Sequence, residues 1–267
     1  MLSFTKMNGA GNDFVLLDNR DGKIQLDPAS IEQLCDRHSG IGADGLLAVE
    51  TAQNGADFRM RYYNSDGGEA EMCGNGARCF ARFAQRLSGQ AGELSFETLA
   101  GVITARFFDR DVEIQMSEPR DLRLNEEVAL GTQAMTVHSV NTGVPHTVTF
   151  VNDLENTEVR SVGAALRRHS HFAPKGTNVN FVNVLSASSI AVRTYERGVE
   201  DETLACGTGM VAAALVTHEI TGATSPISVR VRGGDSLKVA FEKVGASYRN
   251  VLLTGPAAFV FEGQVEI

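Results

Sequence analysis

The chain has 267 residues, 43% of them hydrophobic, and its 24 basic and 33 acidic side chains give a formal net charge of −9. A negative surface repels nucleic acid and acidic lipid, so the sequence argues against a nucleic-acid-binding or membrane-surface protein. The longest apolar run, residues 210–216, is far short of the roughly 20 residues that span a bilayer, and the N-terminus has no signal-peptide pattern, so we expect a cytoplasmic protein.

The first half of the chain reads as short strands around two helices. We expect strands over residues 4–7, 14–18, 94–99, 102–108 and 112–117. Asp27 and Pro28 are typical of a helix start, and Gly40 marks the expected end of that helix. A second helix is predicted over residues 74–87, with Gly89 just past its end.

The polar stretch 119–127 is the best candidate linker, because the pattern restarts after it. Strands are expected over residues 135–141, 146–151, 179–185 and 190–195, with a helix over 159–169. A further helix begins at Gly207 and ends before Gly222, and about four short strands close the chain. The length allows two domains, each with its own core.

An internal repeat is the most informative feature. Met-Cys-Gly-Asn-Gly-Ala at residues 72–77 is matched by Ala-Cys-Gly-Thr-Gly-Met at residues 205–210. Each segment is a Cys-Gly-x-Gly turn that opens a helix, and Cys73 and Cys206 are 133 residues apart (206 − 73), about half the chain. The repeat predicts two similar halves that face each other across a cleft.

A thiol at a helix N-terminus meets the positive end of the helix dipole and backbone N–H groups, which favour its thiolate. The glycines that follow allow a substrate to approach closely, so that these N–H groups can hold a carboxylate. Removing the weakly acidic α-hydrogen of an amino acid places negative charge on that carboxylate, and each preorganised donor stabilises it by about 3 kcal/mol.

Inversion of a stereocentre needs a base on one face of the carbon and an acid on the other. Cys73 and Cys206 meet that need if one is a thiolate and the other a thiol, with roles that exchange as the handedness of the substrate changes. A single Cys-Gly-x-Gly favours a buried structural cysteine, but its recurrence favours catalysis. Cys35 and Cys79 read as core residues; a metal site built from Cys35, His38 and Cys79 lacks a second spaced pair.

With these residues in place, the chain resembles the diaminopimelate epimerase family from end to end. The segments that carry the resemblance are Lys-Met-x-Gly-x-Gly-Asn-Asp-Phe at 6–14, Tyr-Asn-x-Asp-Gly at 63–67, Cys-Gly-Asn-Gly-Ala-Arg-Cys at 73–79, Gly-x-Pro-His at 143–146, Gly-Thr-Asn-Val-Asn-Phe at 176–181, and Tyr-Glu-Arg-Gly at 195–198 leading into Thr-Leu-Ala-Cys-Gly-Thr-Gly at 203–209. Six segments in the same order make the resemblance specific.

The resemblance implies an α+β fold of two pseudo-symmetric α/β halves, each a curled, mostly antiparallel sheet around a central helix, with the active site in the cleft between them. Its last strand returns to the first half, so we expect domains of residues 1–118 with 256–267, and of residues 119–255. It also implies a homodimer, no pyridoxal phosphate or other cofactor, and no metal. The implied reaction interconverts LL- and meso-diaminopimelate for lysine and peptidoglycan precursor synthesis.

The resemblance also assigns site residues by motif. It makes Cys73 and Cys206 the acid/base pair, assisted by His146 and Glu196. The amides that open the two helices would hold the reacting carboxylate; they belong to Gly74, Asn75, Gly207 and Thr208. The far ammonium and carboxylate of the substrate would be recognised by Asn12, Asn64, Asn178, Glu196 and Arg197, in keeping with the bidentate pairing of arginine with carboxylates.

Two departures from the family pattern bear on the substrate. Many members have Asn where this chain has Val144, and several have Gln where Gly45 stands. A cofactor-independent racemase of the same fold that acts on another amino acid therefore remains an alternative. Two further alternatives are a thiol redox sensor, in which Cys73 and Cys206 form a regulatory disulfide, and a module that binds an amino acid without reacting with it.

Overall fold

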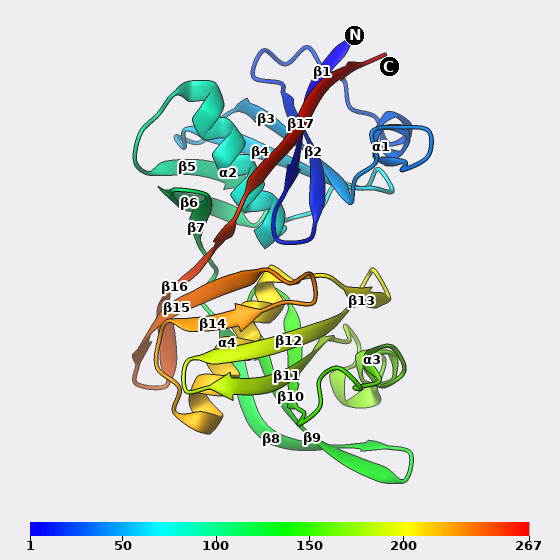
Figure 1. The fold of residues 1–267 in the computed structure, drawn as a ribbon, viewed down its shortest axis with the longest axis vertical. Helices are drawn as coiled ribbons and strands as arrows, with labels where there is room; N and C mark the ends of the chain where they lie inside the picture. The colour runs from blue at the N-terminus through cyan, green and yellow to red at the C-terminus, as the bar shows by residue number, and fades with distance from the viewer. Residues whose placement is uncertain (267) are drawn as a thin grey trace. The chain divides into compact units, whose positions relative to one another are not determined.

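The computed structural model describes residues 1–266, and the chain in it divides into two compact units. Unit 1 consists of Met1–Gln115 with Thr254–Ile267, and unit 2 is Met116–Leu253. Figure 1 shows that each unit wraps a largely antiparallel sheet around one long helix. No helix within residues 1–266 is long and apolar enough to cross a membrane.

Unit 1 is built on one curved sheet. Its strands are β1 (Leu2–Asn8), β2 (Asp13–Asp18), β3 (Gly45–Thr51), β4 (Phe58–Asn64), β5 (Leu94–Thr98), β6 (Gly101–Phe108), β7 (Asp111–Gln115) and β17 (Ala258–Val265). They pair in the order β17-β1-β2-β3-β4-β5-β6-β7, with parallel pairs only at β2–β3 and β4–β5. The last strand thus returns beside the first, as expected (Figure 1).

Helix α2 (Gly74–Ser88) is the central helix of unit 1 and contacts strands β2 to β7. Its Phe80, Phe83 and Ala84 are buried, and the Phe80 ring packs against that of Phe96 with centroids 4.8 Å apart. Gly89 ends the helix in the left-handed conformation, at a φ of 68° that favours glycine. The sequence predicted this helix to within one residue at its C-terminal end.

Helix α1 (Pro28–Cys35) begins as predicted and ends earlier. Asp27 accepts hydrogen bonds from the amides of Ala29 and Ser30, which is ordinary N-capping. The expected end near Gly40 is wrong. Asp36 turns to an extended backbone, and its carboxylate accepts the amide of Ser39, which starts a turn in place of another helical turn.

Unit 2 repeats the design. Its elements are β8 (Arg120–Leu130), β9 (Gln133–Asn141), β10 (Pro145–Phe150), α3 (Val159–Arg167), the 3-10 helix η1 (Ser170–Phe172), β11 (Asn178–Ser186), β12 (Ser189–Glu196), β13 (Asp201–Thr203), α4 (Gly207–Thr221), β14 (Ile227–Arg230), β15 (Ser236–Val244) and β16 (Ser247–Pro256), whose last residues belong to unit 1. The pairing order is β8-β9-β10-β11-β12-β14-β15, with β13 also antiparallel to β12.

The two units share one topology. In unit 1 the run β2-α1-β3-β4-α2-β5-β6 has parallel pairs at β2–β3 and β4–β5; in unit 2 the run β10-α3-β11-β12-α4-β14-β15 has parallel pairs at β10–β11 and β12–β14. The central helices are both 15 residues long and both end at a left-handed glycine. The predicted α+β fold with two pseudo-symmetric halves is confirmed.

The segment predicted as a linker, residues 119–127, is instead most of strand β8. Val128 is the only buried residue of β8; Leu122, Leu124 and Leu130 are half-buried, and most of its polar residues are exposed. Two register shifts against β9 and positive φ angles at Asp121 and Asn125 interrupt its pairing. Apolar residues do alternate with polar ones along β8, but the charged residues between them favoured the interpretation as a linker.

Candidate active site

The two repeat cysteines occupy the same position in their units. Cys73 is the N-cap of α2 with φ −134° and ψ 121°, and Cys206 is the N-cap of α4 with φ −126° and ψ 107°. Neither side chain caps its own helix. Each thiol therefore lies at a helix N-terminus, where the first amides have no intrahelical acceptor and the helix dipole favours negative charge.

In unit 1 a glycine-rich loop packs directly on the first turn of α2. A Cβ atom on Gly9 would lie 2.7 Å from the carbonyl oxygen of Asn75, so only glycine allows this contact. The Asn75 side chain donates to Asn12 Oδ1 at 2.7 Å, and Asn12 Nδ2 donates to Asp44 Oδ2 at 2.9 Å. Two of the predicted substrate-binding residues, Asn12 and Asn75, are therefore in direct contact.

Charged residues hold this loop in place. The Asp13 carboxylate pairs with Lys6 at 2.8 Å and with Arg37 at 2.7 Å, and Arg37 also reaches Asp44 at 2.8 Å. Burial alone would raise the pKa of Asp13, but its hydrogen bonds from Arg37 and Lys6 lower that pKa to about 2. The Asp13 carboxylate therefore remains ionised throughout the physiological pH range.

Arg78 lies in the Cys-Gly-Asn-Gly-Ala-Arg-Cys segment at 73–79, and the sequence predicted no role for it. It is fully buried, and its guanidinium donates to the carbonyl of Gly9 at 3.0 Å, to Asn75 Oδ1 at 2.9 Å and to the carbonyl of Gly74 at 3.3 Å. Arg78 thus joins the glycine-rich loop to the first turn of α2. In the sequence, the charged Arg78 on an otherwise apolar face of the predicted helix was the signal that could have indicated this role.

Asn64 lies apart from this contact, at the exposed end of β4, and accepts a hydrogen bond from the Tyr62 hydroxyl at 2.8 Å. It pairs in register with Gly45 of β3. A Cβ atom on Gly45 would lie 2.5 Å from the Tyr63 carbonyl oxygen and 3.0 Å from the Tyr62 ring. No larger side chain fits at position 45 in this unit, chiefly because the Tyr63 backbone oxygen lies too close.

Cys206 is buried and has two polar neighbours. Its thiol is hydrogen-bonded to the Glu196 carboxylate, and its Sγ lies 3.6 Å from the Thr208 hydroxyl. Burial, followed by the charge and hydrogen bond of Glu196, raises the pKa of Cys206 well above its usual value. The thiolate expected from the helix dipole is therefore outweighed at this residue, and Cys206 is a thiol at neutral pH.

His146, at the start of β10, lies in the same cluster. Its Nε2 is 2.9 Å from the Thr208 hydroxyl, which links it to Cys206. Burial, with a smaller contribution from the positive charge of Arg197, lowers the pKa of His146 to about 3. His146 is therefore a neutral imidazole at physiological pH.

Three of the residues predicted for the far end of the substrate, Asn178, Glu196 and Arg197, lie in unit 2. Asn178 Oδ1 accepts the backbone amide of Arg197 at 2.8 Å, and Asn178 Nδ2 donates to the Pro145 carbonyl at 3.1 Å. His146 and Asn178 are neighbours in the parallel β10–β11 register. The Thr142 hydroxyl donates to the Thr208 carbonyl at 2.9 Å and fastens the turn that contains Val144 to α4.

Unit 2 thus gathers six of the predicted site residues around the start of α4: His146, Asn178, Glu196, Arg197, Cys206 and Thr208, with Gly207 between the last two. Unit 1 gathers Asn12, Cys73, Gly74 and Asn75 around the start of α2, with Asn64 at the end of a neighbouring strand. Asn180 also contacts the unit 2 group, because its Nδ2 lies 3.1 Å from His146 Nδ1, although the sequence gave Asn180 no role.

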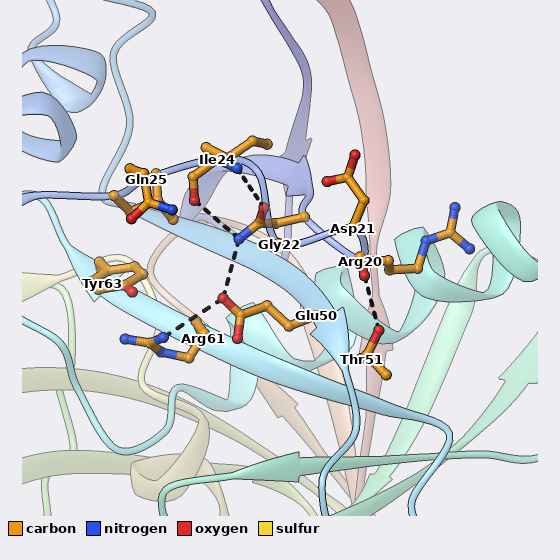
Figure 2. A pocket seen from close by; sticks show the side chains of 11 residues that line it. Arg20, Asp21, Gly22, Ile24, Gln25, Glu50, Thr51, Arg61 and Tyr63 are labelled. Atoms are coloured by element: carbon orange, nitrogen blue, oxygen red, sulfur yellow. Dashed lines mark hydrogen bonds and ion pairs between the residues drawn. The ribbon is translucent and has the colours of Figure 1, made fainter.

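A cavity of about 410 Å³ lies elsewhere in unit 1 (Figure 2). It is lined by Glu50, Arg61 and Tyr63 among others, and by none of the predicted site residues. Some of its polar groups pair with one another, as in the Arg61–Glu50 pair at 3.7 Å that Figure 2 marks. Within residues 1–266 no three His, Cys, Asp or Glu side chains are arranged to hold a metal ion, so the Cys35, His38 and Cys79 set forms no such cluster.

Comparison with known proteins decides the family. The family model for diaminopimelate epimerase matches residues 4–121 and 138–260. The chain belongs to the diaminopimelate epimerase family. It is 42% identical to the diaminopimelate epimerase of Aquifex aeolicus, over 99% of this chain and 98% of that protein, and 40% identical to that of Chlorobaculum tepidum, over 98% of this chain and the whole of that protein. The family resemblance predicted from the motifs is confirmed.

Solved structures with low sequence identity share the fold. A PhzF-family phenazine biosynthesis protein of Bacillus anthracis matches with a TM-score of 0.74 at 14% identity, covering 100% of this chain and 99% of that one. A hydroxyproline epimerase of Agrobacterium vitis, with bound trans-4-hydroxy-L-proline, matches with a TM-score of 0.72 at 17% identity, covering 99% of this chain and 92% of that one. The diaminopimelate epimerase fold thus extends beyond the family.

Proposed function

We propose that this chain interconverts LL- and meso-diaminopimelate by moving the α-proton between two thiols, Cys73 and Cys206, without a cofactor. Membership of the diaminopimelate epimerase family supports the reaction and the substrate. One observation supports the two residues: each is the N-cap of the central helix of its unit, in two units of the same topology. The catalytic and binding roles of the individual site residues are part of this proposal.

The proposed reaction has two proton transfers. A cysteine thiolate on one face removes the α-hydrogen as a proton and becomes a thiol, while the bonding electrons move into the adjacent carboxylate. The thiol on the opposite face then gives its proton to the carbon and becomes a thiolate, which completes the inversion. The amides of Gly74, Asn75, Gly207 and Thr208 would hold the charged carboxylate between these steps.

The surroundings of Cys206 suit the direction of the reaction in which Cys206 acts as the acid. Because its pKa is raised, Cys206 holds its proton at neutral pH and can donate it to the carbanion. For the reverse direction Cys206 must act as a base, and the hydrogen-bonded Glu196 carboxylate is placed to accept the thiol proton. Cys73 would be the thiolate in the first direction and the acid in the second.

The far end of the substrate is assigned to polar groups of both units. Arg197, whose amide is fixed by Asn178, would pair with the distal carboxylate, and Asn12, Asn64 and Glu196 would surround the distal ammonium. Val144 and Gly45 supply no polar side chain to this set. The Tyr62 hydroxyl, which donates to Asn64, would orient that asparagine toward the substrate.

Solvent deuterium exchange tests the proposal directly. LL-diaminopimelate incubated with the protein in D₂O, with no added cofactor, should gain deuterium at the α-carbon as meso isomer forms, measured by NMR and chiral chromatography. Proline, hydroxyproline and glutamate are the comparison substrates. Equal turnover of any of these three would contradict the substrate assignment. A lack of deuterium in all four compounds, diaminopimelate included, would indicate a binding module.

We also propose that the protein is a cytoplasmic homodimer. The apolar side chains of Phe259, Val260 and Phe261 on β17 are 40–57% exposed, and a second copy would bury them. The substitution Val260→Glu, whose side chain is the most exposed of the three, should shift the sedimentation coefficient from that of a dimer to that of a monomer. A wild-type protein that sediments as a monomer at micromolar concentration would contradict the dimer.

A further inference from the structure

Asn180 is a buried polar residue in the middle of unit 2 that the proposed mechanism does not use. It lies on β11 between Val148 of β10 and Thr194 of β12, and its side chain is fully buried. Its amide nitrogen is 3.0 Å from the Thr147 carbonyl oxygen and 3.1 Å from His146 Nδ1. Its amide oxygen accepts a hydrogen bond from the Thr194 hydroxyl at 3.0 Å.

These contacts fix the orientation of the Asn180 amide. The backbone carbonyl oxygen of Thr147 only accepts hydrogen bonds, so the part of the Asn180 side chain that faces it must be the NH₂ group. The opposite atom is then the carbonyl oxygen, which agrees with the hydroxyl of Thr194 as its donor. The second hydrogen of the NH₂ group is directed at His146.

The amide orientation in turn fixes the tautomer of His146. Because Nδ1 receives a hydrogen bond from Asn180, Nδ1 must carry a lone pair, and the single proton of the neutral imidazole lies on Nε2. Nε2–H therefore donates to the Thr208 hydroxyl oxygen at 2.9 Å. A buried imidazole held in this way has one defined donor.

The same reasoning sets the direction of the Thr208 hydroxyl. Its oxygen accepts from His146, so its own proton points elsewhere, and Cys206 Sγ lies 3.6 Å away. We propose that Asn180 is a positioning residue that holds His146 in the Nε2–H tautomer and thereby directs the Thr208 hydroxyl proton at Cys206 Sγ. The inference rests on the proposed role of Cys206 as acid and base.

Helix α4 is fitted closely to this arrangement. A Cβ atom on Gly209 would lie 2.3 Å from Asn180 Oδ1 and 3.3 Å from Cys206 Sγ. The Asn180 side chain cannot move aside without giving up its bonds to Thr147, Thr194 and His146. Gly209 therefore allows α4 to approach Asn180 so that Thr208 bridges His146 and Cys206.

The chain of hydrogen bonds has a chemical consequence for Cys206. Asn180, His146 and Thr208 each donate to the next member, and the last donates to sulfur, so the chain stabilises a thiolate there. Glu196 on the other side accepts the thiol proton. Cys206 thus lies between a donor that favours its charged form and an acceptor that takes its proton, which suits a residue that alternates between acid and base.

The tautomer can be measured in the wild-type protein. Imidazole ¹⁵N chemical shifts, recorded with ¹⁵N-histidine labelling and assigned with a His146→Gln sample, distinguish a protonated nitrogen from one with a lone pair. We expect Nε2 of His146 to be protonated and Nδ1 to be unprotonated at neutral pH. Protonated Nδ1 would overturn the proposal, and this readout does not depend on the substrate or on activity.

The substitution Asn180→Asp reverses the key hydrogen bond, because a carboxylate accepts from Nδ1–H. We expect His146 to switch to the Nδ1–H tautomer and kcat for diaminopimelate to fall about 10- to 100-fold with KM little changed. Asn183→Asp is the matched control: Asn183 also lies on β11 and donates to the carbonyl of Val151, but it has no histidine partner. An equal loss in both variants, or an unchanged His146 spectrum in Asn180→Asp, would overturn the proposal.

Thr208 variants test whether the effect travels through the hydroxyl. Thr208→Val should lower kcat while Thr208→Ser retains most of it, because serine keeps the donor. The double variant Asn180→Asp with Thr208→Val should be little slower than the slower single variant, since both interrupt the same chain. Fully multiplicative losses would overturn the relay. A wild-type protein with the Nε2–H tautomer but no epimerase activity would contradict the proposed function and leave the hydrogen-bond assignment intact.

Discussion

Replacing Cys73 or Cys206 with alanine is expected to lower the rate of LL-to-meso conversion by at least about 10³-fold. A positioned acid or base contributes roughly 10²- to 10⁴-fold, and inversion needs both groups in each turnover. The loss should appear in kcat, measured by chiral chromatography from either stereoisomer, with substrate binding retained. The two single variants should be about equally inactive, because neither thiol can replace the other on its face of the carbon.

The matched control for this experiment is Cys79→Ala. Cys79 lies on the same helix as Cys73 but is fully buried, and burial raises its pKa to about 12, so it has no thiolate to offer at neutral pH. Its replacement should leave kcat within a few-fold of wild type. Full turnover by Cys73→Ala or Cys206→Ala would reject the two-thiol mechanism.

The Glu196→Gln substitution is expected to reduce kcat by about 10²- to 10³-fold. Gln keeps the shape of the side chain but does not accept the Cys206 proton at neutral pH, so the half-reaction in which Cys206 is the base fails. A second readout follows from the electrostatics. The Glu196 charge helps to raise the pKa of Cys206, so its removal should lower that pKa and let iodoacetamide label Cys206 at lower pH than in wild type.

Glu155→Gln provides the control for the loss of one carboxylate. Glu155 belongs to the same unit, and its side chain is 78% exposed, where it pairs with Arg232. We expect wild-type kcat and an unchanged pH profile of Cys206 labelling. If Glu196→Gln behaves in the same way, Glu196 serves neither as a proton acceptor nor as the cause of the raised pKa of Cys206.

Local sequence signals predicted the two central helices well. Each begins directly after a cysteine that is followed by Gly-x-Gly, and each ends at a glycine, Gly89 or Gly222, in the left-handed conformation. These signals lie within a few residues of the element they define. The repeat added the long-range information, because it indicated that residues 133 positions apart (206 − 73) hold equivalent places in two units.

Elements without such signals were missed or misread. Strand β8 was predicted as a linker because its side chains are mostly polar, and only one of its residues is buried. Strands β3 and β4 were not singled out. In β3 five consecutive residues, 45–49, are buried, so the strand lacks the alternation that identifies a half-buried strand.

The site could be predicted as far as its residue types allowed. The cysteines, His146 and Glu196 carry reactive groups, so motif and chemistry agreed on them. Asn180 has no reactive group, and its role depends on the bonds that its amide makes with neighbouring strands. The raised pKa of Cys206 was likewise beyond local reasoning, because the helix position favours the thiolate and only the burial and the Glu196 neighbour reverse that.

The two cysteines have unequal environments in a pseudo-symmetric fold, but the equilibrium between the two stereoisomers limits the effect of that inequality on catalysis. The ratio of the two stereoisomers at equilibrium belongs to the molecules in solution, and no arrangement around Cys206 can alter it. A stronger interaction of Glu196 or Thr208 with that sulfur therefore changes kcat and KM in both directions. The changes must leave the ratio of the forward and reverse kcat/KM values equal to the equilibrium constant. The asymmetry therefore sets the substrate concentration at which each direction reaches half of its maximal rate, but not the ratio of the two kcat/KM values.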